Sequence, residues 1–129
     1  MSAPEPVIPA GYEAFYNDFH FAPATRVGDR LYVSGQIGFA DGLGVSDDPE
    51  TQFTAAFEHV KAVLAGAGKT LADIVDMTTF HVGLQQHAAT FMAVKDRYIE
   101  APYPSWTAIG ISELFVPGAL VEIKVIATG

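Results

Sequence analysis

The chain has 129 residues, no cysteine, and fifteen acidic against seven basic side chains, which gives a net charge of −8. This length fits one domain with a sizeable core. The lack of cysteine excludes disulfides, thiolate metal sites and cysteine nucleophiles, and it suits a reducing compartment, so we predict a cytoplasmic protein. Because phosphate contacts supply most non-specific affinity for nucleic acids, an acidic chain with scattered basic residues is not expected to bind RNA or DNA.

The first residues carry no targeting signal that we can identify. Residues 1–11 contain three prolines, one acidic residue and no apolar run, whereas a signal peptide needs a charged and a hydrophobic region. We predict a flexible arm at 1–11, followed by a single domain at 12–129. No run of about 18 apolar residues occurs in the chain, so neither a membrane span nor a membrane partner is expected.

Apolar and polar side chains alternate within residues 27–37, which predicts a first strand that ends at Gly35. Leu31 and Val33 share one face of this strand, and Ser34 lies on the other face. One further strand is considered near residues 15–21.

Two segments have the spacing of amphipathic helices. Asp48 before Pro49 predicts the start of a helix that continues to about residue 67, where glycines end it. The apolar residues of this helix recur at spacings of four, three and four: Phe53, Phe57, Val60 and Leu64. A second helix is predicted over 87–99 from the spacing of Phe91, Val94 and Tyr98.

Three more strands are predicted, at 74–82, 105–111 and 120–128. The strand at 74–82 is apolar on both faces, which is typical of a strand inside a sheet. Strands and helices in this order indicate an α+β fold, a mixed β-sheet with two α-helices packed on one face.

Alternation also predicts which side chains share a face of the sheet. If the branched aliphatic residues of the last strands face the helices, the uncovered face carries Ser34, Trp106, Glu122 and Lys124. An uncovered face with apolar residues would expose a large patch to water, so we expect self-association to cover it.

Three segments resemble the RidA (YjgF) family of small trimeric proteins. They are Leu31-Tyr-Val-Ser-Gly-Gln-Ile-Gly38, Pro104-Ser-Trp-Thr-Ala-Ile-Gly110 and Gly118-Ala-Leu-Val-Glu-Ile-Lys-Val-Ile-Ala127. The resemblance implies the chorismate-mutase-like fold of that family and a homotrimer with a ligand cleft at each subunit interface. It also implies hydrolysis of reactive imine and enamine metabolites without a cofactor.

The same resemblance implies a set of site residues. In the deaminating members an arginine grips the substrate carboxylate, helped by a tyrosine, a serine and an asparagine, while a glutamate positions the attacking water. By motif position these places fall on Trp106, Phe21, Ser34, Lys95 and Glu122, so only the serine and the glutamate are retained. We predict Glu122 as the catalytic residue. The predicted ligand-binding residues are Phe21, Ser34, Gly35, Lys95, Trp106 and Ala108.

Each of these residues has a structural interpretation beside the functional one. Trp106 is either an interface packing residue or the wall of a pocket for a planar or apolar ligand. Glu122 either pairs with Lys124 or acts as a base whose pKa is raised by an apolar cleft. The interpretation favoured for Lys95 is extension to water, and the alternative is that it replaces the missing positive charge. Ser34 is expected to line the pocket rather than to act as a nucleophile.

The four histidines lack the spacing of a metal site, so no metal is predicted. The leading functional hypothesis is a homotrimer that binds a small metabolite and hydrolyses an imine or enamine at Glu122. Without the arginine, 2-imino acids are not expected to be good substrates. The alternative is a non-catalytic ligand-binding or regulatory trimer. A ribonuclease or translation inhibitor, a function carried by family naming, is the least favoured because of the acidic charge.

Overall fold

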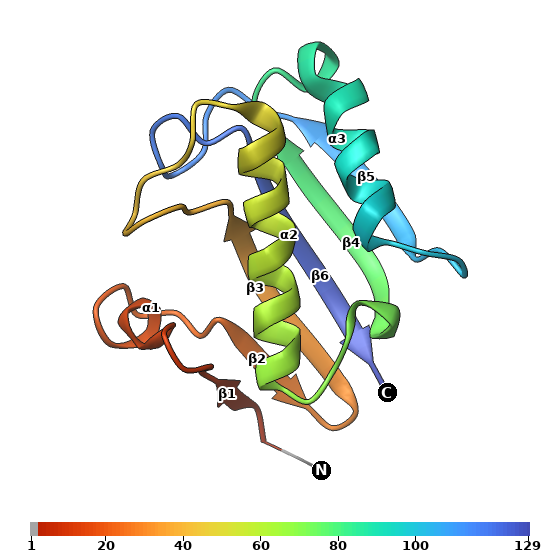
Figure 1. Cartoon of the computed structure of the whole chain (residues 1–129). Coiled ribbons are helices and arrows are strands. Elements are labelled where there is room, and N and C mark those ends of the chain that lie inside the picture. Colours follow the sequence, from red (N-terminus) through yellow and green to blue (C-terminus); the bar gives the residue numbers. More distant parts are fainter. Residues whose placement is uncertain (1–2) are drawn as a thin grey trace.

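The computed structural model describes residues 3–129, which form one mixed sheet with two long helices on one face (Figure 1). In chain order the elements are β1 (Glu5–Val7), α1 (Glu13–Asn17), β2 (Ala24–Val27), β3 (Arg30–Ile37), α2 (Pro49–Gly66), a 3₁₀ turn (Leu71–Asp73), β4 (Ile74–His81), α3 (Leu84–Tyr98), β5 (Ser105–Gly110) and β6 (Val121–Thr128). This architecture confirms the predicted fold class and adds the short helix α1.

The six strands lie in the order β1-β2-β3-β6-β4-β5. Only the β4–β5 pair is parallel, and every other neighbouring pair is antiparallel. The last strand in the chain, β6, therefore lies at the centre of the sheet, between β3 and β4. The prediction that residues 74–82 form an inner strand is confirmed, because β4 is flanked by β6 and β5.

The core lies between the sheet and the two long helices. On β6 the predicted alternation holds, since Val121, Ile123 and Val125 are buried while Lys124 is exposed. The predicted apolar stripe of α2 is buried over its whole length. The helix begins where the sequence predicts it, because the Asp48 carboxylate accepts a hydrogen bond of 2.9 Å from the backbone N–H of Thr51.

The N-terminal segment differs from the sequence-based expectation. Residues 15–21 contain no strand; they run from α1 into a loop, and Phe15 and Phe19 lie one helical turn apart. The spacing of four between Phe15 and Phe19 is compatible with a helix, and the spacing of two between Phe19 and Phe21 with a strand, so the pattern alone does not decide between them. Within the arm expected at 1–11, β1 pairs with β2, while residues 1–2 lie outside the described part. No helix in residues 3–129 is long and apolar enough to cross a membrane.

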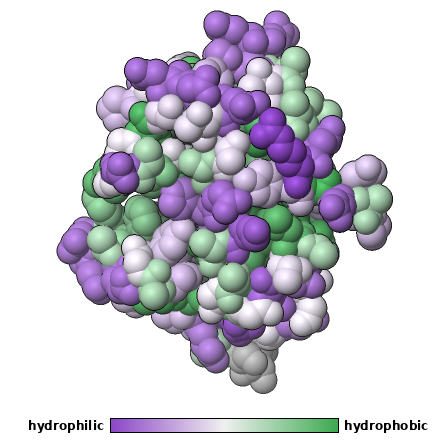
Figure 2. Space-filling view, viewed as in Figure 1, coloured by the Kyte–Doolittle hydropathy of each residue, from purple (hydrophilic) through white to green (hydrophobic). Residues whose placement is uncertain are grey.

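The helix-covered side of the protein carries a mixture of hydrophilic and hydrophobic residues (Figure 2). Below it, the buried amide of Gln52 connects α2 to two loops. The amide nitrogen donates to the carbonyl oxygens of Ser46 and Gly118, at 3.0 and 3.1 Å, and the amide oxygen accepts from the backbone N–H of Leu120. Through these three hydrogen bonds Gln52 holds the loops around 46 and 118 close to the end of β3.

The end of β3 also approaches the backbone of α2 very closely. A Cβ atom at Gly38 would meet the carbonyl oxygen of Gln52, whereas a Cβ at Gly44 would find only one atom within 4 Å, at 3.9 Å. Neither glycine has a positive φ angle. The two positions therefore differ in available space and not in backbone strain.

We predict that Gly38→Ala lowers the free energy of unfolding by about 2 kcal/mol or more, because a rigid backbone atom must move to admit the methyl group. Gly44→Ala is the matched control and should change it by less than about 0.5 kcal/mol. Urea denaturation of the three proteins measures both effects. Equal stabilities of the two variants would show that α2 does not hold the end of β3 in this position.

Candidate functional site

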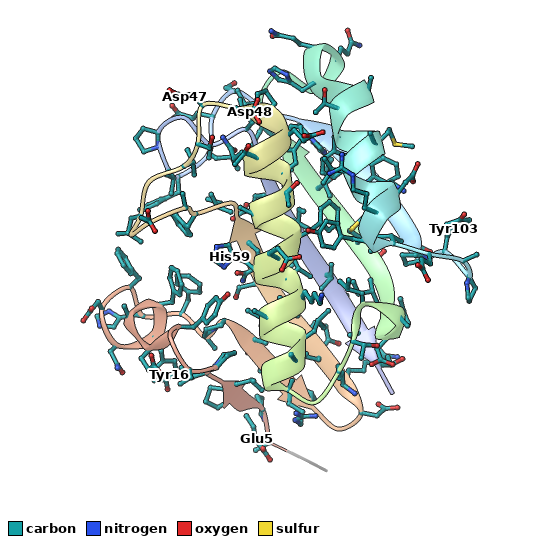
Figure 3. All side chains as sticks on the ribbon, viewed as in Figure 1. Glu5, Tyr16, Asp47, Asp48, His59 and Tyr103 are labelled. Atoms are coloured by element: carbon teal, nitrogen blue, oxygen red, sulfur yellow. The ribbon has the colours of Figure 1, made fainter. Side chains whose placement is uncertain are left out.

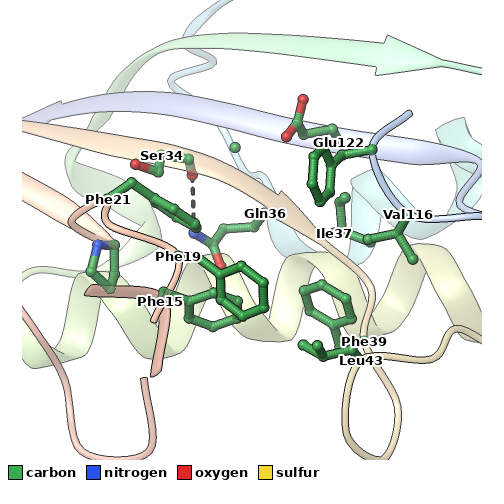
Figure 4. Close-up of a pocket in the computed structure, with 13 residues that line it drawn as sticks. Phe15, Phe19, Phe21, Ser34, Gln36, Ile37, Phe39, Leu43, Val116 and Glu122 are labelled. Carbon is green, nitrogen blue, oxygen red and sulfur yellow. Dashed lines mark hydrogen bonds between the residues drawn. The ribbon is translucent and has the colours of Figure 1, made fainter. Parts of the chain in front are cut away.

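A cavity of about 480 Å³ lies at the end of β3, on the side of the sheet that α2 and α3 leave open. Its walls come from α1 and the segment after it, from β3 and from β6. Two loops complete them, one between β3 and α2 and the other before β6. Its lining residues are Phe15, Phe19, Phe21, Pro23, Ser34, Gly35, Gln36, Ile37, Phe39, Leu43, Phe115, Val116 and Glu122. Figure 4 shows Ser34 and Glu122 on one side and Phe15, Phe19 and Phe39 on the other. Four of the predicted site residues therefore meet here: Phe21, Ser34, Gly35 and Glu122.

Glu122 is the one titratable residue among those lining the cavity. It projects from β6 on the face opposite to Val121 and Ile123, as the alternation predicts. Burial raises the pKa of Glu122 above its ordinary value, and the attraction of Lys124 offsets part of this effect. Among residues 3–129, no ion pair joins Glu122 to Lys124. Lys124 therefore acts on Glu122 from a distance and not through a direct salt bridge, and the carboxylate faces an apolar cavity.

Gly35 provides the space that the carboxylate occupies. A Cβ atom at Gly35 would overlap the carboxyl group of Glu122. The pairing of β3 with β6 shifts its register between Val33 and Gln36, so Ser34 and Gly35 lie in an irregular stretch of the strand. Such a bulge re-aims side chains next to a site, and here it brings glycine backbone directly against the acid.

Ser34 lines the cavity but is not arranged as a nucleophile. Its hydroxyl donates a hydrogen bond of 2.6 Å to the carbonyl oxygen of Ala22. No histidine or carboxylate in the described part of the chain accepts the hydroxyl proton, which a serine nucleophile would need. The hydroxyl oxygen retains lone pairs that can accept from a ligand.

Four phenylalanines form an aromatic cluster centred on Phe15. The ring centroid of Phe15 lies 6.3 Å from Phe19, 5.4 Å from Phe21 and 5.9 Å from Phe39. Sequence reasoning identified Phe21 but missed the others. The sequence signal for the other phenylalanines was the number of aromatic residues in 12–21, which is larger than one short strand needs for packing against a core.

His59 fixes this cluster to α2. Its Nε2 lies 3.0 Å from the carbonyl oxygen of Phe39, and its Nδ1 lies 2.7 Å from the hydroxyl of Tyr12. A carbonyl can only accept, so Nε2 carries the proton and Nδ1 accepts from the tyrosine. Figure 3 shows His59 on the side of α2 that faces α1. The histidine therefore has a structural role.

Trp106 lies elsewhere, and its predicted position on the uncovered face is wrong. In the parallel β4–β5 pair Trp106 is opposite Met77, whose side chain is buried beneath the helices. Its indole N–H donates to the hydroxyl of Thr79 at 2.9 Å, and its ring packs beside Phe91 of α3. The indole is 37% exposed. Ala108 is on the same side of β5, so both residues are separated from Glu122 by the sheet.

Lys95 accompanies Trp106 and does not extend to water. The residue is 8% exposed, and its ammonium group lies 4.8 Å from the centroid of the indole ring and 3.6 Å from the carboxylate of Asp96. The interpretation of Lys95 as a solvent-exposed side chain is wrong. A cation–π contact with the indole of Trp106 holds the Lys95 ammonium group at the edge of the sheet.

His81 belongs to the same buried group. Its Nε2 lies 2.7 Å from the hydroxyl of Thr79, the atom that also accepts from Trp106. Burial lowers the pKa of His81, so the imidazole is neutral at pH 7. No three histidine, aspartate or glutamate side chains within residues 3–129 gather in the way a metal ion requires.

The raised pKa of Glu122 has a measurable consequence for stability. Because the folded state holds the carboxyl proton more tightly than the unfolded state, the free energy of unfolding falls as the pH rises from the ordinary glutamate pKa through the raised folded value. We predict that Glu122→Gln, which cannot ionise, gains stability relative to the parent protein across this interval and keeps the gain at higher pH. Urea denaturation between about pH 4 and pH 8 measures the difference. The exposed Glu113→Gln is the control; a difference between Glu122→Gln and the parent that does not change with pH would contradict the burial of the charge.

Comparisons with known proteins agree with this geometry. The family model described as Endoribonuclease L-PSP matches residues 13–129. The RutC family protein YjgH of Escherichia coli (strain K12) is 40% identical over 122 residues, which cover 94% of this chain and 92% of the relative. A 2-iminobutanoate/2-iminopropanoate deaminase of Dermatophagoides farinae is 28% identical over 124 residues, which cover 95% and 87%.

A solved structure of protein YJGH matches with a TM-score of 0.87 at 40% identity, over 96% of this chain and 95% of the other. The sequence resemblance and the strand order thus agree with a relative of nearly equal length. From the matched family model and the identity to YjgH, the chain belongs to the RidA/YjgF family.

Proposed function

We propose that the protein binds a small metabolite in the cavity beside Glu122 and hydrolyses its imine, or the imine tautomer of an enamine. The observation that carries the proposal is the Glu122 carboxylate, which has a raised pKa and no ion-pair partner in the described structure. A carboxylate with a raised pKa is a stronger base, and so removes a proton from water more effectively, than an ordinary one. The relative from Dermatophagoides farinae is named a deaminase of two imines, which is consistent with this chemistry.

The proposed reaction consumes one water molecule. Glu122 accepts a proton as the water oxygen adds to the imine carbon, and the electron pair of the C=N bond moves to nitrogen. Glu122 returns this proton to that nitrogen, which gives a carbinolamine. The hydroxyl proton of the carbinolamine then moves to the nitrogen as the C=O bond forms and the C–N bond breaks, and a carbonyl compound and ammonia leave. Ser34 contributes its hydroxyl oxygen as an acceptor at the wall of the cavity and takes no part in covalent chemistry.

Substrates with a carboxylate are not favoured. No lysine, arginine or histidine lines the cavity, and Trp106 stands where the resemblance implies the arginine. The loss of a charge-assisted hydrogen bond of about 1.5 to 3 kcal/mol corresponds to one or two decades of affinity. We therefore place 2-imino acids among the poor substrates of this protein.

A homotrimer is part of the proposal. The open face of the sheet carries apolar side chains beside the Glu122 row, because Phe80 is opposite Glu122 and Ile109 is opposite Phe80. Tyr32 and Ile126 form a second such pair across β3 and β6. Burial of this face between three subunits would remove it from water.

The second candidate is a trimer that binds its ligand without turnover. The observation in its favour is that the catalytic set implied by the family is incomplete, with only the serine and the glutamate retained. A ribonuclease function rests on the description of the matched family model. The net charge of −8 and the absence of a basic residue in the cavity lining argue against it.

Ammonia release from freshly generated 2-iminopropanoate tests the substrate range. We expect turnover at least about tenfold below that of an arginine-bearing family member, since the carboxylate finds no cation in the cavity. A rate equal to that of the relative would refute the exclusion of 2-imino acids.

Glu122→Gln separates the two candidate functions. On any imine that the parent protein hydrolyses, the variant is expected to lose at least about a hundredfold in kcat while the trimer, measured by sedimentation, stays intact. Glu113→Gln serves as the control and should retain full activity. Retention of activity in Glu122→Gln would exclude Glu122 as the base. A parent protein that hydrolyses no imine would leave the binding function as the better account.

A further inference from the structure

The cavity beside Glu122 combines many aromatic faces with a single negative charge. Five phenylalanines line it, Phe15, Phe19, Phe21, Phe39 and Phe115, together with aliphatic side chains from Leu43, Ile37 and Val116. Glu122 is its one ionisable group. An apolar pocket of this size with one carboxylate and no cation is not suited to an anionic ligand, because two negative charges would share a region of low dielectric constant.

A positively charged ligand meets the opposite conditions. The face of an aromatic ring is electron-rich and attracts an ammonium or iminium group with about 0.5 to 2 kcal/mol, the more so when water is excluded. The half-buried carboxylate of Glu122 lacks an ion-pair partner within 4 Å in residues 3–129, and a ligand cation would supply one. The aromatic rings and the Glu122 carboxylate therefore both favour a positively charged ligand.

The protein's own cations do not occupy this position. Lys124 is on the same strand face as Glu122, but it is exposed, lies two residues away and is not part of the cavity lining. Lys95 is held by Trp106 and Asp96 beneath α3. Gly35 adds backbone without a side chain next to the carboxylate, so small groups can approach it closely.

The mouth of the cavity is apolar as well. Phe115, in the loop before β6, is 92% exposed although it is a large hydrophobic residue, and Leu43, in the loop before α2, is also exposed. Both line the cavity. Exposure of apolar side chains at the rim of a pocket is typical of contact with a ligand or a partner, and it provides a place for a hydrophobic substituent.

We propose that this cavity selects organic cations, an amine or iminium group bearing an apolar or aromatic substituent and no carboxylate, with Glu122 as the counter-ion and the phenylalanine rings as the surrounding cage. This assignment deepens the proposed function and, for its catalytic part, rests on it. The substrate of the hydrolysis is then an iminium ion, and the balanced reaction is R₂C=NH₂⁺ + H₂O → R₂C=O + NH₄⁺. The class of reaction that supplies such a substrate is the oxidation of an amine.

Binding of three ligands of the same shape tests the selection by charge. Benzylamine, benzyl alcohol and benzoate carry a positive charge, no charge and a negative charge at pH 7.5. By isothermal titration calorimetry at low salt we expect benzylamine to bind at least about tenfold tighter than benzyl alcohol, and benzoate to bind weakest. Benzoate binding as tightly as benzylamine, or no detectable binding of benzylamine at millimolar concentration, would overturn the proposal.

Two variants test whether the preference for benzylamine comes from the Glu122 carboxylate and from the phenylalanine rings. Glu122→Gln should abolish the advantage of benzylamine while it leaves benzyl alcohol within about twofold, and Glu113→Gln should change neither. Phe21→Leu keeps an apolar side chain but removes a ring, so benzylamine should lose more affinity than benzyl alcohol. An unchanged order of the three ligands in Glu122→Gln would remove the carboxylate from the proposal, and equal losses in Phe21→Leu would remove the rings.

The outcome is separable from that of the proposed hydrolysis. Cation selection with no turnover of any iminium would leave the binding assignment standing and contradict the catalytic function. Hydrolysis of imines that depends on Glu122 but prefers carboxylate substrates would support the catalytic function and contradict the selection by charge.

Discussion

The carboxylate of Glu122 lies against the bare backbone of Gly35 at the edge of an apolar cavity, and the chemistry of the site depends on this one placement. The central strand β6 carries the acid, the irregular pairing of β3 with β6 makes room for it, and the aromatic segment after α1 closes the opposite wall. A charged group in these surroundings is costly unless something compensates it. What compensates it determines what the cavity binds.

Two polar side chains of α2, the buried Gln52 and the half-buried His59, hold the walls of the cavity in place. Gln52 bonds the loops around Ser46 and Gly118, which carry the rim residues, and His59 bonds Tyr12 and the backbone of Phe39 next to the aromatic cluster. α2 is therefore more than a cover for the sheet, because its side chains connect the core to the loops that line the cavity. A site made mostly of loop and helix-end residues becomes rigid through such hydrogen bonds.

The sequence predicts the centre of this fold better than its periphery. Alternation in β6 and the stripe of α2 have one polar and one apolar face, so the burial of Val121, Ile123 and Phe53 follows from pattern alone. β5 offers no such contrast, since both of its faces carry apolar side chains, and the bulky Trp106 turned out to face α3. Only the pairing of β5 with β4 decides its orientation, and pairing is not readable from a single strand.

The site was predictable to a similar degree. Motif positions identified Phe21, Ser34, Gly35 and Glu122, which the fold brings to one cavity, while Lys95, Trp106 and Ala108 lie on the far side of the sheet. The aromatic density over 12–21 was a signal for the aromatic wall around Phe15, but its geometry was not readable from the sequence, because a loop and hydrogen bonds between distant segments bring its residues together. Family membership fixes the architecture, and the lining of the cavity is where this chain's own chemistry is expressed.

The most direct test of the account is the titration of the Glu122 side-chain carboxyl carbon by NMR, in the free protein and with saturating benzylamine. The account predicts a pKa above the ordinary glutamate value in the free protein and a clear decrease when the cation binds, because a ligand charge stabilises the ionised carboxylate. An ordinary or lowered pKa in the free protein, unchanged by the amine, would contradict it.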